Sequence, residues 1–407
     1  MRKYIGILLA FAFILASCSP AHVTITPIPL ISTSSPGPTV TPKSTTCTLL
    51  HFPVTPEAAL GAEFEGRSHI SGPTDAPVTI VAFSDYQCLP CAFLAASLRK
   101  IRLTHPNDLR LVYFHAPQTV YDKDNLAIQA VEAADLQGKF WEMHDLLFEG
   151  QAQWIDLAPS DFEAWAETQA TSLGMNAAQF RTDFGGTVVA DRLQQAIQSV
   201  ALQPFASPRL YVNSTSPYTS LADFASLDTV VRMDALVARQ FSTCPSNNID
   251  PLKQYIATMH TAKGDVVLQL YPEKVPLAVN NFVFLARSGW YDGITFYRVL
   301  PSEQVMSGDP SETGLGNPGY LFETEIASGL SFNKPGMLAM DNDGPGTNGS
   351  RFFITLEPNP QLDGQFTIIG QVLTGLDILS MLNPRNPLPG IYLPPGDELI
   401  SIRIEER

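Results

Sequence analysis

Residues 78–91, Val-Thr-Ile-Val-Ala-Phe-Ser-Asp-Tyr-Gln-Cys-Leu-Pro-Cys, contain the pattern that decides the fold of the first half of the chain. The first six residues are apolar or β-branched without alternation, which is typical of a strand buried on both faces. Cys88 and Cys91 follow, and the stretch from Ala92 through Ile101 predicts a helix. The cysteine pair therefore stands between a strand and a helix N-terminus, where the helix dipole stabilises a thiolate.

A Cys-x-x-Cys pair is compatible with a redox couple, with half of a zinc site or with a structural disulfide. The sequence contains no second Cys-x-x-Cys and no Cys-x-x-His that would complete a zinc site. The position at the start of a helix favours a redox couple. The structural disulfide stays open as the alternative.

The residues around this pair resemble those of a known family. The segment 72–91, Gly-Pro-Thr-Asp-Ala-Pro followed by the strand and the cysteine pair, is similar to the beginning of a DsbA-like thioredoxin-fold domain. The resemblance covers about residues 56–245. It implies an α/β thioredoxin fold that carries a helical insertion between its two halves.

The same resemblance implies roles for three residues. Cys88 is expected to be the exposed nucleophile, Cys91 the buried resolving thiol, and Pro208 the cis-proline that faces them. Strongly oxidising members hold a histidine between the cysteines, whereas this chain has Leu89 and Pro90. We therefore expect a milder oxidant.

The sequence pattern changes beyond residue 252. Residues 265–271, Asp-Val-Val-Leu-Gln-Leu-Tyr, alternate like a half-buried strand, and residues 276–288 predict an amphipathic helix that begins with a proline. Short apolar runs separated by glycine-rich turns then predict a closed β-barrel over residues 252–407. The single histidine of this region, His260, argues against Ser/His or Cys/His catalysis, because the general base would be missing.

Several segments of this region resemble cyclophilin, the eight-stranded barrel of peptidyl-prolyl isomerases. They are Pro276–Phe282, Gly289–Gly293, Phe296–Val299, Gly336–Thr355 and Leu362–Gly364. Rotation about an X–Pro amide is slow because resonance sets a barrier of ~18–20 kcal/mol. A cationic donor aimed at the twisting amide weakens that resonance, which is electrostatic stabilisation of a transition state.

The cyclophilin resemblance implies a role for each of four residues. Arg298 is the cationic donor, Phe353 and Leu362 line the proline pocket, and Asn342 holds the backbone of the bound peptide. The alternative for Arg298 is a surface arginine in a solvated loop.

The chain departs from the cyclophilin pattern at eight positions around this groove. They are Glu303, Gln304, Met306, Asp341, Asp343, Arg351, Gln361 and Phe366. Three of them are carboxylates, which either pair with Arg298 and slow catalysis or attract basic residues beside the proline. We expect weak isomerase activity that depends on Arg298 and is higher for peptides with Lys or Arg near the proline.

The N-terminal residues carry a secretion pattern. Two basic residues precede a short apolar run, and the tetrapeptide 15–18, Leu-Ala-Ser-Cys, resembles the lipobox of bacterial lipoproteins. The pattern predicts a signal peptide over residues 1–17 and lipidation of Cys18, with a short membrane anchor as the alternative. Residues 19–46 are rich in Pro, Ser and Thr, which predicts an extended tether over residues 18–55.

Two further cysteines, Cys47 and Cys244, bracket the DsbA-like region. Disulfides persist in exported proteins, so we expect a bond between them that closes a long loop. Two unpaired thiols are the alternative, because the sequence does not establish that the Cα atoms approach within the ~7 Å that a disulfide requires.

The charge balance restricts the class of partner. Among 407 residues, 25 are Lys or Arg and 40 are Asp or Glu, which gives a net charge of −15. A nucleic-acid-binding protein needs a basic face to neutralise phosphates. We therefore expect no nucleic-acid partner.

Together these features predict a lipid-anchored, extracytoplasmic folding factor that isomerises X–Pro bonds and exchanges disulfides. Its expected partners are exported polypeptides that contain X–Pro and Cys segments, a redox protein that recycles the cysteine pair, and the membrane through the lipid. No cofactor and no metal are expected. The alternatives are a prolyl-peptide-binding module with little catalysis joined to a redox or structural domain, and a lipoprotein in which the pair is only a structural disulfide.

Overall fold

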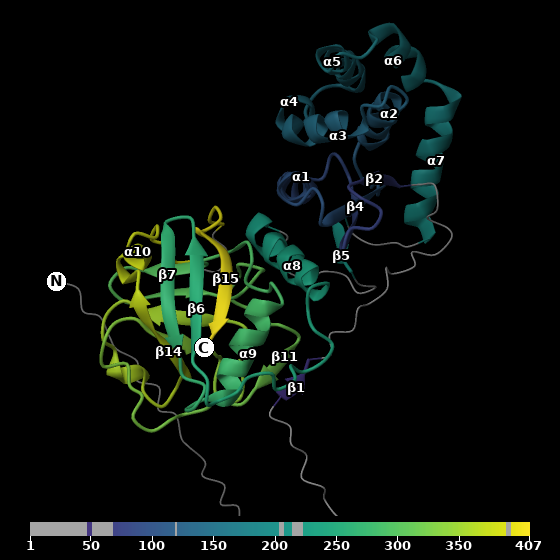
Figure 1. The fold of residues 1–407 in the computed structure, drawn as a ribbon. Helices are drawn as coiled ribbons and strands as arrows, with labels where there is room; N and C mark the ends of the chain where they lie inside the picture. The colour runs from purple at the N-terminus through teal and green to yellow at the C-terminus, as the bar shows by residue number, and fades with distance from the viewer. Residues whose placement is uncertain (1–46, 51–67, 119, 203–206, 214–222, 388–391) are drawn as a thin grey trace, which may run out of the picture. The chain divides into compact units, whose positions relative to one another are not determined.

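Figure 1 shows the computed structural model of the chain, which describes residues 47–50, 68–118, 120–202, 207–213, 223–387 and 392–407. The predicted signal peptide, the predicted lipidation site Cys18 and most of the predicted tether lie outside the described residues. Among the helices that are described, none combines the length and the apolar character needed to cross a bilayer.

The first region is built on a four-stranded sheet with the order β2-β4-β3-β5. The two central strands, β3 (Val78–Ser84) and β4 (Leu109–His115), run parallel. The edge strands β2 (His69–Ser71) and β5 (Arg209–Val212) pair antiparallel with β4 and β3 respectively. Helix α1 (Leu89–Thr104) connects β3 to β4, as a parallel pair requires a crossover connection.

Among the described residues, six helices separate β4 from β5 along the chain. They are α2 (Asp124–Asp135), α3 (Phe140–Glu149), α4 (Gln151–Trp154), α5 (Pro159–Ser172), α6 (Ala177–Phe184) and α7 (Thr187–Leu202). Figure 1 shows α7 running from α6 back toward the sheet. Helix α8 (Phe224–Val237) follows β5. The region is a thioredoxin-like α/β fold with inserted helices, so the predicted fold class is confirmed here.

Strand β3 is buried on both faces, as its unbroken apolar run predicts. Val78, Ile80 and Ala82 belong to the main core of this region, whereas Val81 and Phe83 belong to a smaller cluster. Alternate residues of a strand point to opposite faces, so the two clusters mark the two sides of the sheet. The strand thus holds the following cysteine pair at the end of a rigid, buried element.

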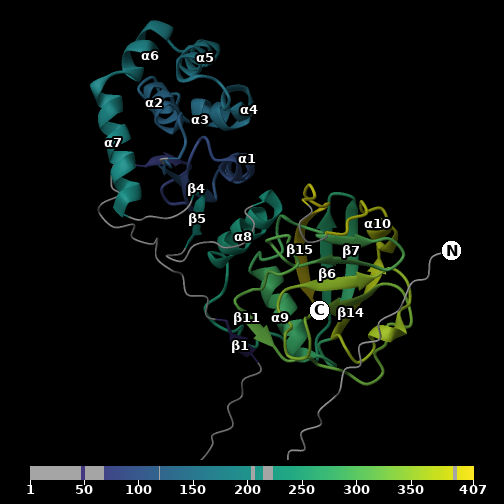
Figure 2. The same cartoon turned by 180° about the vertical axis from the view of Figure 1, so that it is seen from behind.

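The second region is a strongly curled antiparallel sheet, of which Figure 2 labels β6, β7, β14 and β15. The sheet has nine strands in the order β8-β15-β6-β7-β14-β12-β13-β10-β9. Its strands are β6 (Tyr255–Thr261), β7 (Gly264–Leu270), β8 (Ile294–Thr295), β9 (Arg298–Leu300), β10 (Gln304–Ser307), β12 (Met337–Met340), β13 (Phe352–Thr355), β14 (Ile368–Thr374) and β15 (Glu398–Glu406). The resemblance implies eight strands; nine are described, and the shortest, β8, has two residues. The helices are α9 (Pro276–Arg287), α10 (Leu376–Ser380) and the 3₁₀ turn η2 (Pro360–Leu362).

The strands of this sheet sort their side chains into two apolar clusters. On β12, Leu338 and Met340 face the large interior core, whereas Met337 and Ala339 face a smaller outer cluster. Phe353 of β13 also belongs to the outer cluster. The period of two therefore separates the residues of the interior core from those of the smaller, outer cluster.

Part of the predicted tether forms a strand. Strand β1 (Cys47–Leu49) pairs antiparallel with β11 (Tyr320–Phe322), and Cys47 forms a disulfide with Cys244. The Cα atoms of this disulfide are 6.1 Å apart, within the range a disulfide requires. The expectation of an extended tether up to residue 55 is therefore wrong at residues 47–49, because backbone pairing with β11 and the disulfide hold this segment.

Candidate functional sites

Cys88 and Cys91 lie where β3 meets α1, and they are joined as a disulfide. Cys88 is the N-cap residue of α1, and its Sγ accepts a hydrogen bond of 3.2 Å from the backbone N–H of Cys91. A helix N-terminus concentrates unpaired N–H groups and the positive end of the helix dipole. This position stabilises negative charge on the Cys88 sulfur when the disulfide opens.

Both cysteines of the pair are buried in this oxidised form, with exposed fractions of 2% for Cys88 and 0% for Cys91. The expectation of an exposed Cys88 therefore does not hold here. The surface at this point is formed instead by the two intervening residues: Leu89 is 58% exposed, and Pro90 is exposed as well. Phe93, one turn further along α1, is 71% exposed. Apolar side chains thus flank the disulfide on the solvent side.

Pro208 lies beside the cysteine pair. The Ser207–Pro208 peptide bond is cis, and the carbonyl oxygen of Ser207 is 3.7 Å from Sγ of Cys88. Ser207 is itself held by a hydrogen bond from its hydroxyl to the carbonyl of Ala116. The structure therefore brings together the three residues that the thioredoxin-fold resemblance singles out.

Two buried carboxyls, Asp85 and Asp124, lie near the same strand end and were not predicted from the sequence. Asp85 accepts hydrogen bonds from the backbone N–H groups of Gln87 and Gln118, and Asp124 shares the latter donor. Burial, followed by the hydrogen bond and the charge of Asp85, raises the pKa of Asp124 to about 9. No local motif marks these residues, because Asp124 reaches Asp85 only through the fold.

The candidate isomerase groove is assembled by strand register. Met306 of β10 pairs with Arg298 of β9 on one side and with Phe353 of β13 on the other. The ring of Phe353 packs against Phe332 and Phe366 at centroid distances of 5.7 and 5.1 Å. Leu362, from η2, packs against the same cluster. These side chains form an apolar surface next to the guanidinium of Arg298.

Arg298 has an unused donor. Its Nε is buried and has no hydrogen-bond partner among the described residues. A buried donor without a partner costs free energy. A ligand atom that accepts a hydrogen bond from this Nε would remove that cost. Arg298 thus differs from a solvated surface arginine, the alternative that the sequence left open.

Asn342 follows β12 and shapes the loop beside the groove. Its Nδ2 donates to Oδ1 of Asn348 and to the carbonyl of Gln365, and its Oδ1 accepts from the backbone N–H of Gly344. The side chain is therefore engaged in holding this loop. The expected contact of Asn342 with a bound peptide stays a prediction.

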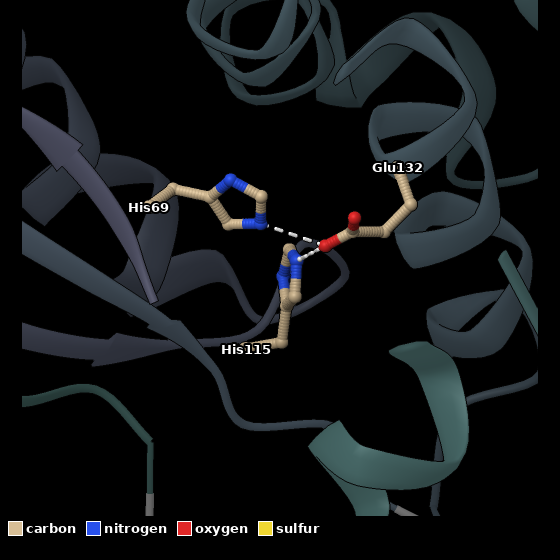
Figure 3. Close-up of side chains that lie close together, drawn as sticks. All are labelled: His69, His115 and Glu132. Carbon is tan, nitrogen blue, oxygen red and sulfur yellow. Dashed lines mark hydrogen bonds and ion pairs between the residues drawn. The ribbon is translucent and has the colours of Figure 1, made fainter. Parts of the chain in front are cut away.

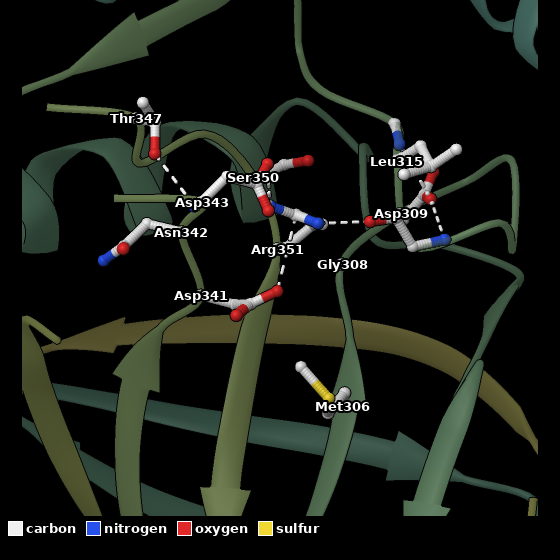
Figure 4. Close-up of polar contacts among 12 residues, drawn as sticks. Met306, Gly308, Asp309, Leu315, Asp341, Asn342, Asp343, Thr347, Ser350 and Arg351 are labelled. Atoms are coloured by element: carbon white, nitrogen blue, oxygen red, sulfur yellow. Dashed lines mark hydrogen bonds and ion pairs between the residues drawn. The ribbon is translucent and has the colours of Figure 1, made fainter. Parts of the chain in front are cut away.

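The acidic residues of the groove pair with Arg351. Figure 4 shows Arg351 between the two aspartates: its Nη2 donates to Asp343 at 2.7 Å, and its Nε is 3.5 Å from Asp341. Its Nη1 donates to the carbonyl of Gly314. Burial raises the pKa of Asp341, although Arg351 acts in the opposite direction. One of the two outcomes expected for these carboxylates, pairing with Arg298, is therefore not seen for either aspartate.

Comparison with known families agrees with both regions. Residues 256–388 match the family model "cyclophilin type peptidyl-prolyl cis-trans isomerase", and residues 65–217 match a thioredoxin model. The fold and the groove thus define a two-domain protein with a thioredoxin-like domain followed by a cyclophilin domain.

Individual relatives are peptidyl-prolyl cis-trans isomerases. Peptidyl-prolyl cis-trans isomerase ppi1 of Schizosaccharomyces pombe is 45% identical over 123 residues, which are 30% of this chain and 79% of the relative. Peptidyl-prolyl cis-trans isomerase A of Mycobacterium tuberculosis is 43% identical over 145 residues, covering 32% of this chain and 80% of the relative. The chain belongs to the cyclophilin-type peptidyl-prolyl isomerase family.

A crystal structure of a cyclophilin-type isomerase from Cryptosporidium parvum is similar at 29% identity. The match covers 38% of this chain and 98% of that chain, with a TM-score of 0.34.

Proposed function

We propose that this protein is a folding factor with two activities, X–Pro isomerisation in the cyclophilin domain and thiol–disulfide exchange at Cys88 and Cys91. The observation that carries the first activity is the unpaired, buried Nε of Arg298 beside the apolar cluster that contains Phe353 and Leu362. Disulfide formation and proline isomerisation are two slow steps of protein folding, and one chain would then catalyse both.

The isomerase reaction needs no covalent intermediate. The apolar cluster offers a surface for the proline ring. Arg298 lies on the adjoining strand β9, directly opposite Met306 of this cluster. As the amide twists, its nitrogen becomes pyramidal, and the lone pair that was delocalised into the carbonyl becomes localised on the nitrogen. A hydrogen bond from Arg298 to that lone pair favours the twisted state over the planar one.

Arg298→Ala tests the isomerase activity. We expect the full chain to accelerate isomerisation of an Ala-Pro peptide and the variant to lose about 100-fold in kcat/KM, the typical cost of a lost transition-state donor. Arg403→Ala, at an exposed arginine of β15, is the matched control. Peptide binding without turnover by the wild type would favour the alternative of a prolyl-peptide-binding module.

The redox activity is supported by the position of the disulfide at the start of α1. In exchange, a thiolate of the substrate attacks one sulfur of the Cys88–Cys91 bond and forms a mixed disulfide. A second substrate thiolate then releases the oxidised substrate and leaves both cysteines reduced; the reverse sequence reduces a substrate. With Cys88 at the helix N-cap, we expect the reduced chain to be alkylated first at Cys88, and equal reaction of Cys91 would contradict this assignment.

We further propose that the protein lies outside the cytoplasm and is anchored by a lipid on Cys18. Its substrates there would be exported polypeptides with X–Pro and Cys segments, and a separate redox protein would recycle the pair. The support is the lipobox-like tetrapeptide at 15–18. Cys18→Ala should shift the protein out of the membrane fraction or block its processing. Unchanged membrane partition, with residues 1–17 still attached in the wild type, would contradict the anchor.

A further inference from the structure

Two histidines and a glutamate meet in the thioredoxin-like domain, away from the cysteine pair in sequence. Figure 3 shows His69, His115 and Glu132 pointing toward one another from β2, β4 and α2. Nε2 of His69 is 2.7 Å and Nε2 of His115 is 2.8 Å from the same oxygen, Oε1 of Glu132. Within the described part of the chain, this is the one group of three such side chains whose ligand atoms lie within 4.8 Å of one another.

The fold produces this arrangement by register. His69 pairs with Tyr113 across the β2–β4 ladder, and His115 lies two residues further along β4, so both imidazoles stand on the same face of the sheet. The side chain of Glu132 points toward the two imidazoles from α2 (Figure 3). Because the three residues are far apart in the sequence, no spacing motif marks them.

The surroundings are those of a built site. The side chains of His115 and Glu132 are buried, and that of His69 is 16% exposed. The ring of His69 stacks on Phe140 at a centroid distance of 3.5 Å, and Tyr113 packs edge-on against His115. The three polar side chains are thus packed against aromatic rings that exclude most water. Of the three, His69 is the side chain most exposed to solvent.

We propose that these three side chains bind one zinc-class divalent ion. Two imidazoles and one carboxylate form a donor set that suits zinc, with a fourth position left for water on the side of His69. Ligand atoms around a tetrahedral zinc ion lie about 3.3 Å apart. The present nitrogen–oxygen separations of 2.7 and 2.8 Å therefore have to widen by roughly half an ångström. The edge position of β2 allows this for His69, whereas His115 stands on the central strand β4, so there the side chain of Glu132 has to move.

The neighbouring charged groups orient the ligands. Arg192 donates to Oε2 of Glu132 and leaves Oε1 for the ion, and it also bonds Asp135. Asp135 lies 3.8 Å from Nδ1 of His69, an ion-pair distance rather than a hydrogen bond, and its negative charge favours a cation at this end of the site. When both imidazoles are neutral, the carboxylates of Glu132 and Asp135 and the guanidinium of Arg192 together carry one net negative charge, which attracts a cation. Binding would fasten the edge strand β2 to α2.

Equilibrium dialysis of the full chain with zinc alone, with both disulfides intact, tests this inference independently of either proposed activity. We expect one zinc ion per chain in the wild type and in the control His260→Ala, whose histidine faces a single carboxylate, Asp265. His69→Ala should bind at least about tenfold more weakly. Cobalt in place of zinc should give visible absorption bands without a thiolate charge-transfer band.

Three outcomes would overturn the inference. They are no zinc uptake by the folded wild type, equal uptake by folded His69→Ala, and a thiolate band that places the ion at cysteines. Glu132→Gln, which keeps the shape of the side chain, should lose the ion as well. Should this buried variant fail to fold by circular dichroism, the comparison of His69→Ala with His260→Ala decides the question by itself.

Discussion

Nη2 of Arg351 lies 2.7 Å from Oδ2 of Asp343, and this ion pair changes the electrostatic character of the isomerase groove. The side chain of Asp343 is 75% exposed, whereas Asp341, which contacts Nε of the same guanidinium, is largely buried. One arginine therefore offsets part of the negative charge of the acidic rim, the group of Glu303, Asp341 and Asp343 beside the groove.

Arg351→Gln should uncover the acidic rim. With the guanidinium removed, Asp343 and Glu303 attract basic residues beside the proline without a competing cation. We expect kcat/KM for Lys- or Arg-containing X–Pro peptides, relative to acidic ones, to rise by less than about tenfold, because exposed pairs contribute only ~0.2–1 kcal/mol each. The measurement compares acidic, neutral and basic peptides at low and high salt, and the preference should shrink at high salt.

The wild type should show the same order of peptides with a smaller ratio, and Arg403→Gln should behave like the wild type. Equal turnover of all three peptides by Arg351→Gln would show that the rim carboxylates do not select substrates.

Asp124→Asn should make the stability of the oxidised chain less dependent on pH. The pKa of Asp124 is raised to about 9 in the folded protein, above the ~3.9 of an unfolded aspartate. Folding therefore favours the protonated form of Asp124. The contribution of Asp124 to the free energy of unfolding is fully present below about pH 4, and it is lost as the pH rises toward 9. Asparagine carries no charge at any of these values and removes this loss.

Thermal unfolding between pH 5 and 9 measures the effect, with Asp156→Asn at an exposed aspartate as the control. We expect the melting temperature of Asp124→Asn to exceed that of the wild type by more at pH 8.5 than at pH 5. A constant difference across this range would show that Asp124 does not titrate in the folded state as its surroundings indicate.

Removing the disulfide between Cys47 and Cys244 should destabilise the protein. The bond closes a loop across a sequence separation of 197 residues, and a lost native disulfide of long span typically costs about 2–4 kcal/mol. The double variant Cys47→Ser/Cys244→Ser should therefore unfold at lower urea concentration. Urea titration followed by tryptophan fluorescence measures this, and an unchanged midpoint would mean that pairing of β1 with β11 holds the segment alone.

The sequence predicted the elements whose local pattern is strong. The apolar run at 78–83 and the alternation at 265–271 correspond to β3 and β7, and the helix expected at 276–288 is α9. Each of these patterns lies within a short run of consecutive residues. The spacing of apolar residues in such a run indicates directly which face of the element is buried.

Contacts between distant residues were not accessible in the same way. The partner of Asp341 and Asp343 is Arg351, and no property of the sequence distinguishes that pairing from pairing with Arg298. The burial of Cys88 in its disulfide and the strand at residues 47–49 likewise depend on segments that only the fold brings together. Side-chain partners across a fold are set by register and packing rather than by local pattern.

The central claim, that one chain carries both an isomerase and a working redox couple, is tested most directly by the reduction potential of Cys88 and Cys91. The full chain is equilibrated in glutathione buffers, and alkylation followed by mass spectrometry reads each cysteine separately, so that the Cys47–Cys244 bond serves as an internal structural disulfide. We predict a potential between about −270 and −120 mV, since the helix N-terminus stabilises the thiolate of Cys88 but no histidine stands between the cysteines. A potential below about −300 mV, as stable as a structural disulfide, would contradict the account.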